Sequence, residues 1–382
     1  MQDRTSYRAP IRIALDAMGG DFAPAMAIKG ALRAARAFDI TLILVGDENI
    51  LWRELEKHKY QGLSLEVRHA PEVIEMGEKP HHMIRKKKRS SLRVAFDLVR
   101  NDEAHAIVSA GNSGAVLYGA LFVLKRLKHV IRPGIAARMP SASGTVVIID
   151  AGANAICKPE NLIEFAVMGS GYFQHVFEIP EPRVGVLSNG EEDSKGTDLT
   201  RDTHEQLKKT KLNYIGYVEG RDVFAGKVDV VVCDGFTGNI VIKTAEGVAQ
   251  NFISVLKSEI SRSFFARIGY LMSRTAFRAF KKRFDYREYG GALLLGVDKP
   301  VVFAHGTSDD LAFMNAIRVA REYVEKDVIS RLRHDIEHTA DLYRFEKRHP
   351  FINRIIRPFS AKEKSSSEAF SPDDDDRIEE NS

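Results

Sequence analysis

Glycine and polar residues suited to holding an anion follow an apolar run near the start of this 382-residue chain, in segment 16–21 (DAMGGD). Gly19 and Gly20 let a backbone come close to a phosphate or a bent pantetheine chain, and Asp21 is placed to cap a following helix. The segment lacks the G-x-G-x-x-G spacing of a dinucleotide fingerprint. Asp16 and Asp21 are candidate substrate-binding residues, although they would repel a pyrophosphate unless paired with cations. A purely structural turn is the alternative interpretation.

A second segment of this kind is 109–114 (SAGNSG), which an apolar helical stretch follows at once. Asn112 and Ser113 supply donors, while Gly111 and Gly114 keep the backbone accessible, as in a phosphate cradle. The alternative is helix capping by Asn112 or Ser113, which needs only one of the two.

Two further segments, 150–154 (DAGAN) and 187–196 (LSNGEEDSKG), combine small and polar residues at the ends of apolar runs. Lys195 is the best electrophilic candidate, because a cation between glycines can hold a phosphate oxygen or a developing oxyanion. A local ion pair with one of the three preceding acids is the alternative. The other candidate binding residues here are Asn154, Asn189 and Gly190.

The segment 233–243 (CDGFTGNIVIK) is another strand, loop and helix unit, with Asp234 and Thr237 at the strand end. Asn239 can donate to an acyl carbonyl, and a plain helix N-cap is its alternative role. Lys243 lies one helical turn further on.

His305 follows the apolar run 301–304 and is placed to reach the same crevice, but a lone histidine is not expected to be a catalytic base. We find no Ser-His-Asp order and no activated cysteine, and Cys233 has the character of a small buried hydrophobe. The pattern indicates no metal and no cofactor.

The elements that must position these residues alternate along the chain. Apolar runs that predict buried strands are followed by amphipathic stretches of helical period, which is typical of β-α-β units. The predicted strands are 11–15, 40–45, 63–67, 104–108, 145–149, 183–187, 228–233 and 301–304. The predicted helices are 24–38, 47–58, 81–100, 113–127, 159–176, 197–209, 238–260 and 308–334. This predicts a three-layer α/β/α, Rossmann-like fold with a mostly parallel sheet, whose strand ends gather the polar loops into one crevice.

Composition limits the class of protein. The apolar fraction of 44% and charged fraction of 28% are typical of a globular protein, and a net charge of +4 is too small to indicate nucleic-acid binding. The two cysteines, Cys157 and Cys233, cannot build a disulfide framework, which fits a reducing cytosol. Without a signal peptide or a membrane span in the sequence, we expect a protein kept inside the cell.

We expect a polar N-terminal extension at 1–10, an α/β/α domain at 11–342 and a C-terminal extension at 343–382 that is acidic and disordered at its end. Segment 258–289 differs from the rest of the domain, because aromatic and aliphatic residues alternate with basic ones. It predicts an amphipathic helical hairpin that lies on an anionic membrane, or else a dimer-interface or core hairpin with a solvated face. The candidate membrane residues are Phe264, Phe265, Ile268, Leu271, Met272, Phe277 and Phe280.

Taken in order, segments 13–21, 111–114, 150–154, 187–196, 233–239 and 285–291 resemble the PlsX family, the phosphate acyltransferases of bacterial phospholipid synthesis. The likeness is collinear over about residues 10–335, and the basic run 85–89 and the acidic tail are departures from it. The resemblance implies that inorganic phosphate attacks the thioester of a long-chain acyl carrier protein in a reversible transfer that gives acyl phosphate. On this hypothesis the 111–114 loop holds phosphate, Lys195 neutralises charge and Asn239 steadies the carbonyl or a pantetheine amide.

The resemblance also implies partners. Carrier proteins are acidic, so Arg85, Lys86, Lys87, Lys88 and Arg89 form a candidate docking patch, with a solvated helix face as the alternative. The family resembles a homodimer that contacts the inner face of the cell membrane and passes its product to an integral glycerol-3-phosphate acyltransferase. The rival functions are a short-chain acyl-CoA phosphate acyltransferase and a non-catalytic membrane scaffold of lipid synthesis.

Overall fold

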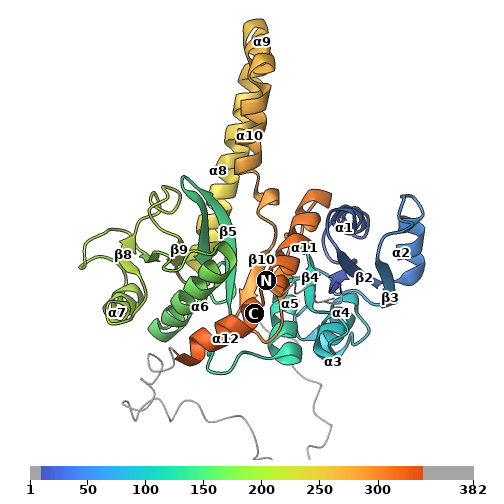
Figure 1. Ribbon diagram of the computed structural model, residues 1–382, viewed down its shortest axis with the longest axis horizontal. Coiled ribbons are helices and arrows are strands. Elements are labelled where there is room, and N and C mark those ends of the chain that lie inside the picture. The colour runs from blue at the N-terminus through green and yellow to red at the C-terminus, as the bar shows by residue number, and fades with distance from the viewer. Residues whose placement is uncertain (1–9, 339–382) are drawn as a thin grey trace, which may run out of the picture. The chain divides into compact units, whose positions relative to one another are not determined.

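An eleven-stranded sheet organises residues 10–338, the part of the chain that the computed structural model describes (Figure 1). Its spatial order is β3-β2-β1-β4-β11-β10-β5-β6-β9-β7-β8. The strands are β1 (Ile11–Asp16), β2 (Ile40–Gly46), β3 (Leu65–His69), β4 (Ala106–Ser109), β5 (Gly134–Ser141), β6 (Gly144–Ile149), β7 (Val184–Leu187), β8 (Tyr214–Val218), β9 (Val230–Val232), β10 (Ala292–Leu295) and β11 (Val301–Phe303). The predicted extensions at 1–10 and 343–382 lie outside the described residues, except for Pro10.

Most neighbouring strands are parallel, as the alternating pattern predicts. β1 pairs in parallel with β2 and β4, and β9 pairs in parallel with β6 and β7. The antiparallel pairs lie at the centre of the sheet, where β10 joins β11 to β5 and a tight turn joins β5 to β6. The mostly parallel α/β fold is therefore confirmed, and the loops after β1, β4, β11, β6, β9 and β7 leave from strand ends.

Helices cover both faces of the sheet. In the first half α1 and α11 lie on one face and α4 on the other, and in the second half α6 packs against β6 and β9 (Figure 1). The helices are α1 (Ala25–Ala37), α2 (Glu48–Leu55), α3 (His82–Arg85), α4 (Ser91–Arg100), α5 (Ser113–Gly119), α6 (Pro159–Phe177), α7 (Asp198–Leu207), α8 (Gly235–Arg262), α9 (Phe264–Met272), α10 (Arg274–Phe284), α11 (Asp310–Glu325) and α12 (Val328–His338), with a π-helical turn η1 (Ala120–Leu124) and a 3-10 turn η2 (Tyr286–Glu288).

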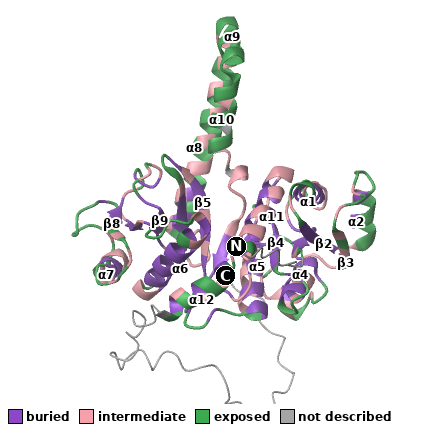
Figure 2. Ribbon diagram, in the orientation of Figure 1, coloured by how far each residue is buried: buried purple, intermediate pink, exposed green. Residues whose placement is uncertain are grey.

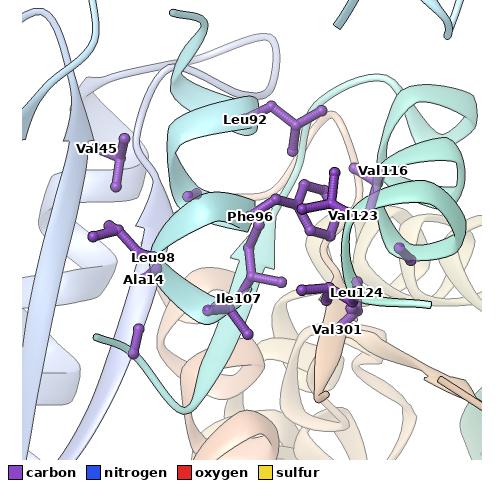
Figure 3. Packing of buried hydrophobic residues seen from close by; sticks show 14 of the residues in the cluster. Ala14, Val45, Leu92, Phe96, Leu98, Ile107, Val116, Val123, Leu124 and Val301 are labelled. Carbon is purple, nitrogen blue, oxygen red and sulfur yellow. The ribbon is translucent and has the colours of Figure 1, made fainter. Parts of the chain in front are cut away.

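Two apolar cores fix these layers. In the first, Phe96 of α4 lies among aliphatic side chains from β1, β4 and α5, including Ala14, Ile107 and Val116 (Figure 3). In the second, Val146 and Val231 contact the start of α8 through Ile242. Figure 2 shows buried residues concentrated in the sheet and in α6. The strand ends are therefore rigid platforms for the loops that leave them.

The predicted helix 81–100 is wrong, because two helices, α3 and α4, separate at the basic run. Ser90 caps α4 by accepting a hydrogen bond from the Arg93 N–H (3.4 Å), and Lys87 turns back to donate to the Val73 carbonyl (2.7 Å). The predicted helix 308–334 also divides, into α11 and α12, at Asp327 with φ of 46°. Strands β5, β8 and β10 were not predicted.

The predicted hairpin segment 258–289 is helical and extends from the sheet as an arm. The arm consists of the second half of α8, then α9 at its tip and α10 returning alongside α8 (Figure 1). Phe252 of α8 and Phe280 of α10 lie together, with ring centroids 6.2 Å apart. Most arm residues are exposed (Figure 2).

Candidate active site

The loops after β1, β4 and β11 meet at one edge of the sheet. The Asp21 N–H donates to the Gly306 carbonyl at 2.8 Å, which ties the first loop to the last. A Cβ at Gly19 would lie 2.7 Å from the Gly111 nitrogen, so only glycine permits this approach between the first and second loops. Segments 16–21, 109–114 and 304–309 therefore form one surface.

Asp16 supports this surface from inside. It is 2% exposed, and its Oδ2 accepts a hydrogen bond of 2.7 Å from the Ser109 hydroxyl. The same hydroxyl accepts from the Gly111 N–H at 3.1 Å. Burial raises the pKa of Asp16. Any contribution of Asp16 to a ligand therefore passes through the backbone of the 109–114 loop.

Asn112 does not have the role expected of it. Its amide nitrogen donates to the carbonyls of Met76 (2.8 Å) and Glu78 (2.9 Å), and its Oδ1 caps α5 by accepting from the Ala115 N–H (3.0 Å). The capping alternative is thus the observed one, and the side-chain amide of Asn112 has no donor left for a phosphate. Ser113, which begins α5, is exposed.

A second group of residues forms where β6 and β9 end. The buried Asp150 accepts hydrogen bonds from Gly152, Ala153 and Asn154. Asn154 donates its side-chain amide to Pro133 and Asp150 (both 2.8 Å), so this amide is used to hold the loop. The loop is in turn joined to α8, because the Gly235 N–H donates to the Asn154 carbonyl at 2.8 Å.

Asn239 is not the N-cap of α8, because Asp234 has that role. Asp234 accepts from the N–H of Thr237 at 2.9 Å and from its hydroxyl at 2.7 Å. Asn239 lies within α8 near its N-terminus, exposed, and a side chain at Gly152 would contact it at 3.8 Å. The exposed Asn239 amide has no hydrogen-bond partner within residues 10–338.

Lys195 extends from the loop after β7, a strand adjacent to β9 in the sheet. The ammonium group is exposed and has no ion-pair partner in the described part of the chain, so the local ion pair suggested as its alternative role is not observed. The loop is closed by Asn189, whose Oδ1 accepts from the Gly196 N–H at 2.9 Å. A Cβ at Gly190 would lie 2.7 Å from Lys195 Cγ, so glycine leaves room for the lysine stem.

A buried histidine that we did not predict anchors the same loop. His204 of α7 is 3% exposed, and its Nε2 lies 3.1 Å from Asp193, two residues before Lys195. Its Nδ1 lies 2.6 Å from the Tyr214 hydroxyl, and its ring stacks on Tyr217 at 4.3 Å. Asp193 also pairs with Lys208 at 2.8 Å. No short-range sequence pattern links these residues, because they lie on a loop, a helix and an edge strand.

His305 joins the two groups of loops. Its Nε2 lies 2.6 Å from the Nζ of Lys243, which is one turn beyond Asn239 on the same face of α8. Its Nδ1 lies 2.8 Å from the Thr307 hydroxyl. Partial burial, followed by the neighbouring Lys243, lowers the pKa of His305. The predicted residues Asn239 and His305 therefore lie on either side of Lys243 in one crevice.

Comparison with known proteins identifies the family. A family model described as "Fatty acid synthesis protein" matches residues 11–331. The phosphate acyltransferase of Geotalea uraniireducens is 52% identical over 333 residues, which cover 87% of this chain and 96% of that protein. The chain belongs to the PlsX family of phosphate acyltransferases. A further relative, the phosphate acyltransferase of Geobacter sulfurreducens, is 51% identical over 338 residues, covering 88% of this chain and 98% of that one.

As a PlsX-family member, the chain is an acyltransferase of lipid synthesis. Its fold is similar to that of a phosphotransacetylase from Streptococcus pyogenes (TM-score 0.51, 18% identity, 86% of this chain and 94% of that chain). It is also similar to a branched-chain phosphotransacylase from Enterococcus faecalis V583 (TM-score 0.53, 15% identity, covering 82% of this chain and 99% of that chain). These likenesses show the α/β fold.

In this PlsX-family chain the basic run 85–89 begins with Arg85, the last residue of α3, and continues as the turn before α4. Lys87 is occupied within the fold, since its ammonium pairs with Glu78 at 2.7 Å. This pairing lowers the pKa of Glu78. The remaining four cations, Arg85, Lys86, Lys88 and Arg89, are exposed.

The arm of this PlsX-family chain exposes large apolar side chains at its tip, including Phe265 (82%) and Met272 (84%). Phe264, Ile268, Leu271 and Phe280 are also exposed, whereas Phe277 is partly covered by Tyr270, with ring centroids 5.1 Å apart. None of the helices within residues 10–338 has both the length and the apolar composition needed to cross a bilayer.

Proposed function

We propose that this acyltransferase moves a long-chain fatty acyl group, reversibly, from acyl carrier protein to inorganic phosphate, and so forms acyl phosphate for glycerol-3-phosphate acylation. The observation that carries the proposal is the crevice in which Asn239, Lys243 and His305 lie beside glycine-bearing loops. Donors and cations converge there, as the transfer of an acyl group to an anion requires.

The reaction needs phosphate and the thioester to be held in the right orientation, and it needs no nucleophilic side chain, because phosphate is itself the nucleophile. A phosphate oxygen attacks the thioester carbonyl carbon, the carbon–sulfur bond breaks, and its electron pair leaves on sulfur. The proton that phosphate gives up is taken by the leaving thiolate, which becomes a free thiol. In this proposal the 109–114 loop holds phosphate through backbone N–H groups and Ser113, Lys195 neutralises charge, and Asn239 donates to the carbonyl oxygen.

The two cysteines are poor nucleophiles, which supports direct attack by phosphate. Cys233 is 3% exposed, and burial raises its pKa well above the ordinary value. Burial, with Asp150 and Asp234 nearby, raises the pKa of Cys157 to about 11. Neither thiol is appreciably ionised at neutral pH, so an acyl-cysteine intermediate is disfavoured.

The acyl carrier protein is the proposed donor because its acidic surface complements the exposed cations of the 85–89 run. Arg85 ends α3, and Lys86, Lys88 and Arg89 lie on the turn between α3 and α4. The same turn is joined through Lys87 to Glu78 and Val73, close to the carbonyls that Asn112 binds. A carrier protein docked there would stand beside the loop proposed to hold phosphate.

We also propose a homodimer that contacts the inner face of the membrane through α9. Exposed apolar side chains on α8, such as Val255 (53%), favour a second copy as their cover. At the tip, exposed aromatic residues alternate with Arg267 and Arg274, which suits an anionic lipid surface. Such contact would bring acyl phosphate to a membrane-bound glycerol-3-phosphate acyltransferase.

The test is to incubate the purified protein with palmitoyl-acyl carrier protein, with and without phosphate, and to measure free thiol together with acyl phosphate trapped as its hydroxamate. We expect both products to appear only with phosphate. Activity with short-chain acyl-CoA alone would favour the short-chain rival. Activity with neither donor would favour the scaffold.

The oligomeric state is measured by light scattering of the protein as it elutes from a size-exclusion column. A monomer would contradict the proposed dimer.

A further inference from the structure

An apolar groove of about 1460 Å³ lies where the arm leaves the sheet. One wall is α8, which lines the groove with Ile240, Ala245, Ala249 and Phe252. The turn between β5 and β6 and the returning helix α10 complete it, the latter through Phe280. Figure 1 shows this region, with α8 rising beside β5.

One end of the groove adjoins the candidate active site. Ile240 directly follows Asn239 on α8, and Thr307, which also lines the groove, lies 2.8 Å from His305. This end carries polar groups, including the Arg287 guanidinium and the Asp309 carboxylate that it pairs with. Toward Phe252 most of the wall is apolar, although Glu246, Gln250 and Arg283 also line it. The groove therefore carries an ion pair where it meets the crevice and is mostly apolar along the arm.

We propose that this groove binds the fatty acyl chain of the substrate, with the thioester carbonyl at Asn239 and the methyl end toward Phe252 and Phe280. The proposal rests on the proposed function and adds to it the place where the chain is held. A linear chain with one polar end matches a groove with the same asymmetry. Burying each methylene is worth about 0.8 kcal/mol, which corresponds to about fourfold in kcat/KM.

A second copy of the protein is the competing occupant of the groove. The continuity with the crevice argues for the acyl chain, because packing between two copies needs no polar end beside His305. Apolar residues of α8 outside the groove lining, such as Val255, remain available to a second copy. The two occupants predict different effects when the groove is narrowed.

The test narrows the groove and measures chain-length preference. Ala245→Phe and Ala249→Phe place a ring in the groove, and Asn251→Phe on α8 is the control, since Asn251 is exposed and is not part of the groove lining. We expect both groove variants to lose at least tenfold in kcat/KM with 16-carbon donors and to stay within twofold with 6-carbon donors. The control should match the wild type at both lengths.

Equal losses at all chain lengths, or no loss at 16 carbons, would overturn the proposal. Loss of the dimer by light scattering, with no change in chain-length preference, would assign the groove to a second copy. Binding of the fluorescent 18-carbon fatty acid cis-parinaric acid is measured in parallel, and we expect the groove variants to weaken it at least tenfold. A wild type that binds this probe but forms no acyl phosphate would contradict the proposed function and leave the groove assignment standing.

Discussion

Lys195 and Asn239 differ from the other polar candidates at the strand ends, because their side chains are not occupied by the fold. Asp16, Asn112, Asn154 and Asp234 use their polar atoms to hold loops and to cap helices. This distinction separates residues that shape the site from those free to contact a ligand. It was not visible in the sequence, where all six residues had similar neighbours.

His204 is predicted to act through the loop that carries Lys195. The hydrogen bonds of its Nε2 with Asp193 and of its Nδ1 with the Tyr214 hydroxyl fix one side of that loop. Burial raises the pKa of Tyr214, so its hydroxyl stays protonated beside the imidazole. We expect His204→Ala to lower kcat about 10- to 100-fold, because small displacements of a catalytic group are costly. The KM for the acyl donor should change little.

His175→Ala is the matched control, since His175 is partly buried on α6 and, like His204, lies beside an aspartate, Asp335, at 2.7 Å. Steady-state kinetics and thermal unfolding are measured for both variants. If His204→Ala and His175→Ala lose kcat equally, His204 supports only the stability of the fold. The same conclusion follows if the conservative variant His204→Gln is no more active than His204→Ala.

Glu164 makes stability depend on pH. It is 1% exposed on α6, and burial raises its pKa to about 7, although it accepts hydrogen bonds from the Ile131 and Arg132 N–H groups. In the unfolded chain its pKa is near 4.5. Between these values the folded state keeps a proton that the unfolded state loses, so the free energy of unfolding falls as pH rises, by at most about 1.4 kcal/mol per pH unit.

Glu164→Gln should remove this dependence in urea unfolding measured from pH 5 to pH 7. The exposed Glu181, changed to Gln, is the control and should keep the wild-type slope. An unchanged slope in Glu164→Gln would mean that the carboxyl does not hold its proton in the folded protein.

At the scale of elements, the basic turn between α3 and α4 is the clearest candidate for recognising a carrier protein. Reversing charge at Lys86 and Lys88 to Glu should raise the KM for acyl carrier protein about tenfold at low salt, and less at high salt, since exposed charges act mainly on encounter. Lys87 is a poor position for this test, because its ion pair with Glu78 belongs to the fold. The KM is measured at about 20 mM and about 300 mM salt, on either side of physiological ionic strength. It is measured with acyl carrier protein and with acyl-pantetheine, a donor that lacks the carrier.

A KM for the carrier protein that stays unchanged in Lys86→Glu/Lys88→Glu would assign the run to a solvated surface. A rise that is equally large with acyl-pantetheine would point to damage at the active site instead.

The helix α9 at the arm's tip is the element predicted to contact lipid. Phe265→Ser/Met272→Ser removes two of its most exposed apolar side chains, each of which contributes about 1.5–3 kcal/mol when buried. We expect cosedimentation with anionic vesicles to fall more than tenfold. Phe236→Ser is the control, because Phe236 is 64% exposed but lies at the start of α8. If the double variant sediments with vesicles as much as the wild type does, the role of α9 is contradicted. It is also contradicted if the wild type does not sediment with vesicles.

At the scale of the whole molecule, the sequence was sufficient for the β-α-β frame, because its parallel strands are continuous apolar runs. β5 was missed because Arg138 and Pro140 interrupt its pattern, although Arg138 is held inside by a 2.9 Å ion pair with Glu322. β10 was missed because a short antiparallel strand after the arm follows no β-α-β alternation.

The candidate site was predicted in outline only. The motifs placed Asn239, Lys195 and His305 at strand ends, but the contact of His305 with Lys243 and the anchoring of Asp193 by His204 join residues 62 and 11 positions apart. Such contacts depend on strand order, which local sequence patterns do not specify. The site therefore emerges only when the sheet β4-β11-β10-β5-β6-β9-β7 is assembled.

The most direct test of the account is phosphate-dependent turnover of palmitoyl-acyl carrier protein in the wild type, Lys195→Ala and Asn239→Ala, with the exposed Lys209→Ala as control. Removing a donor aimed at a developing oxyanion typically costs about 100- to 1000-fold in kcat. We predict losses of this size in the Lys195 and Asn239 variants, with thermal unfolding unchanged and the control fully active. Folded Lys195→Ala and Asn239→Ala proteins that both turn over at the wild-type rate would contradict the account.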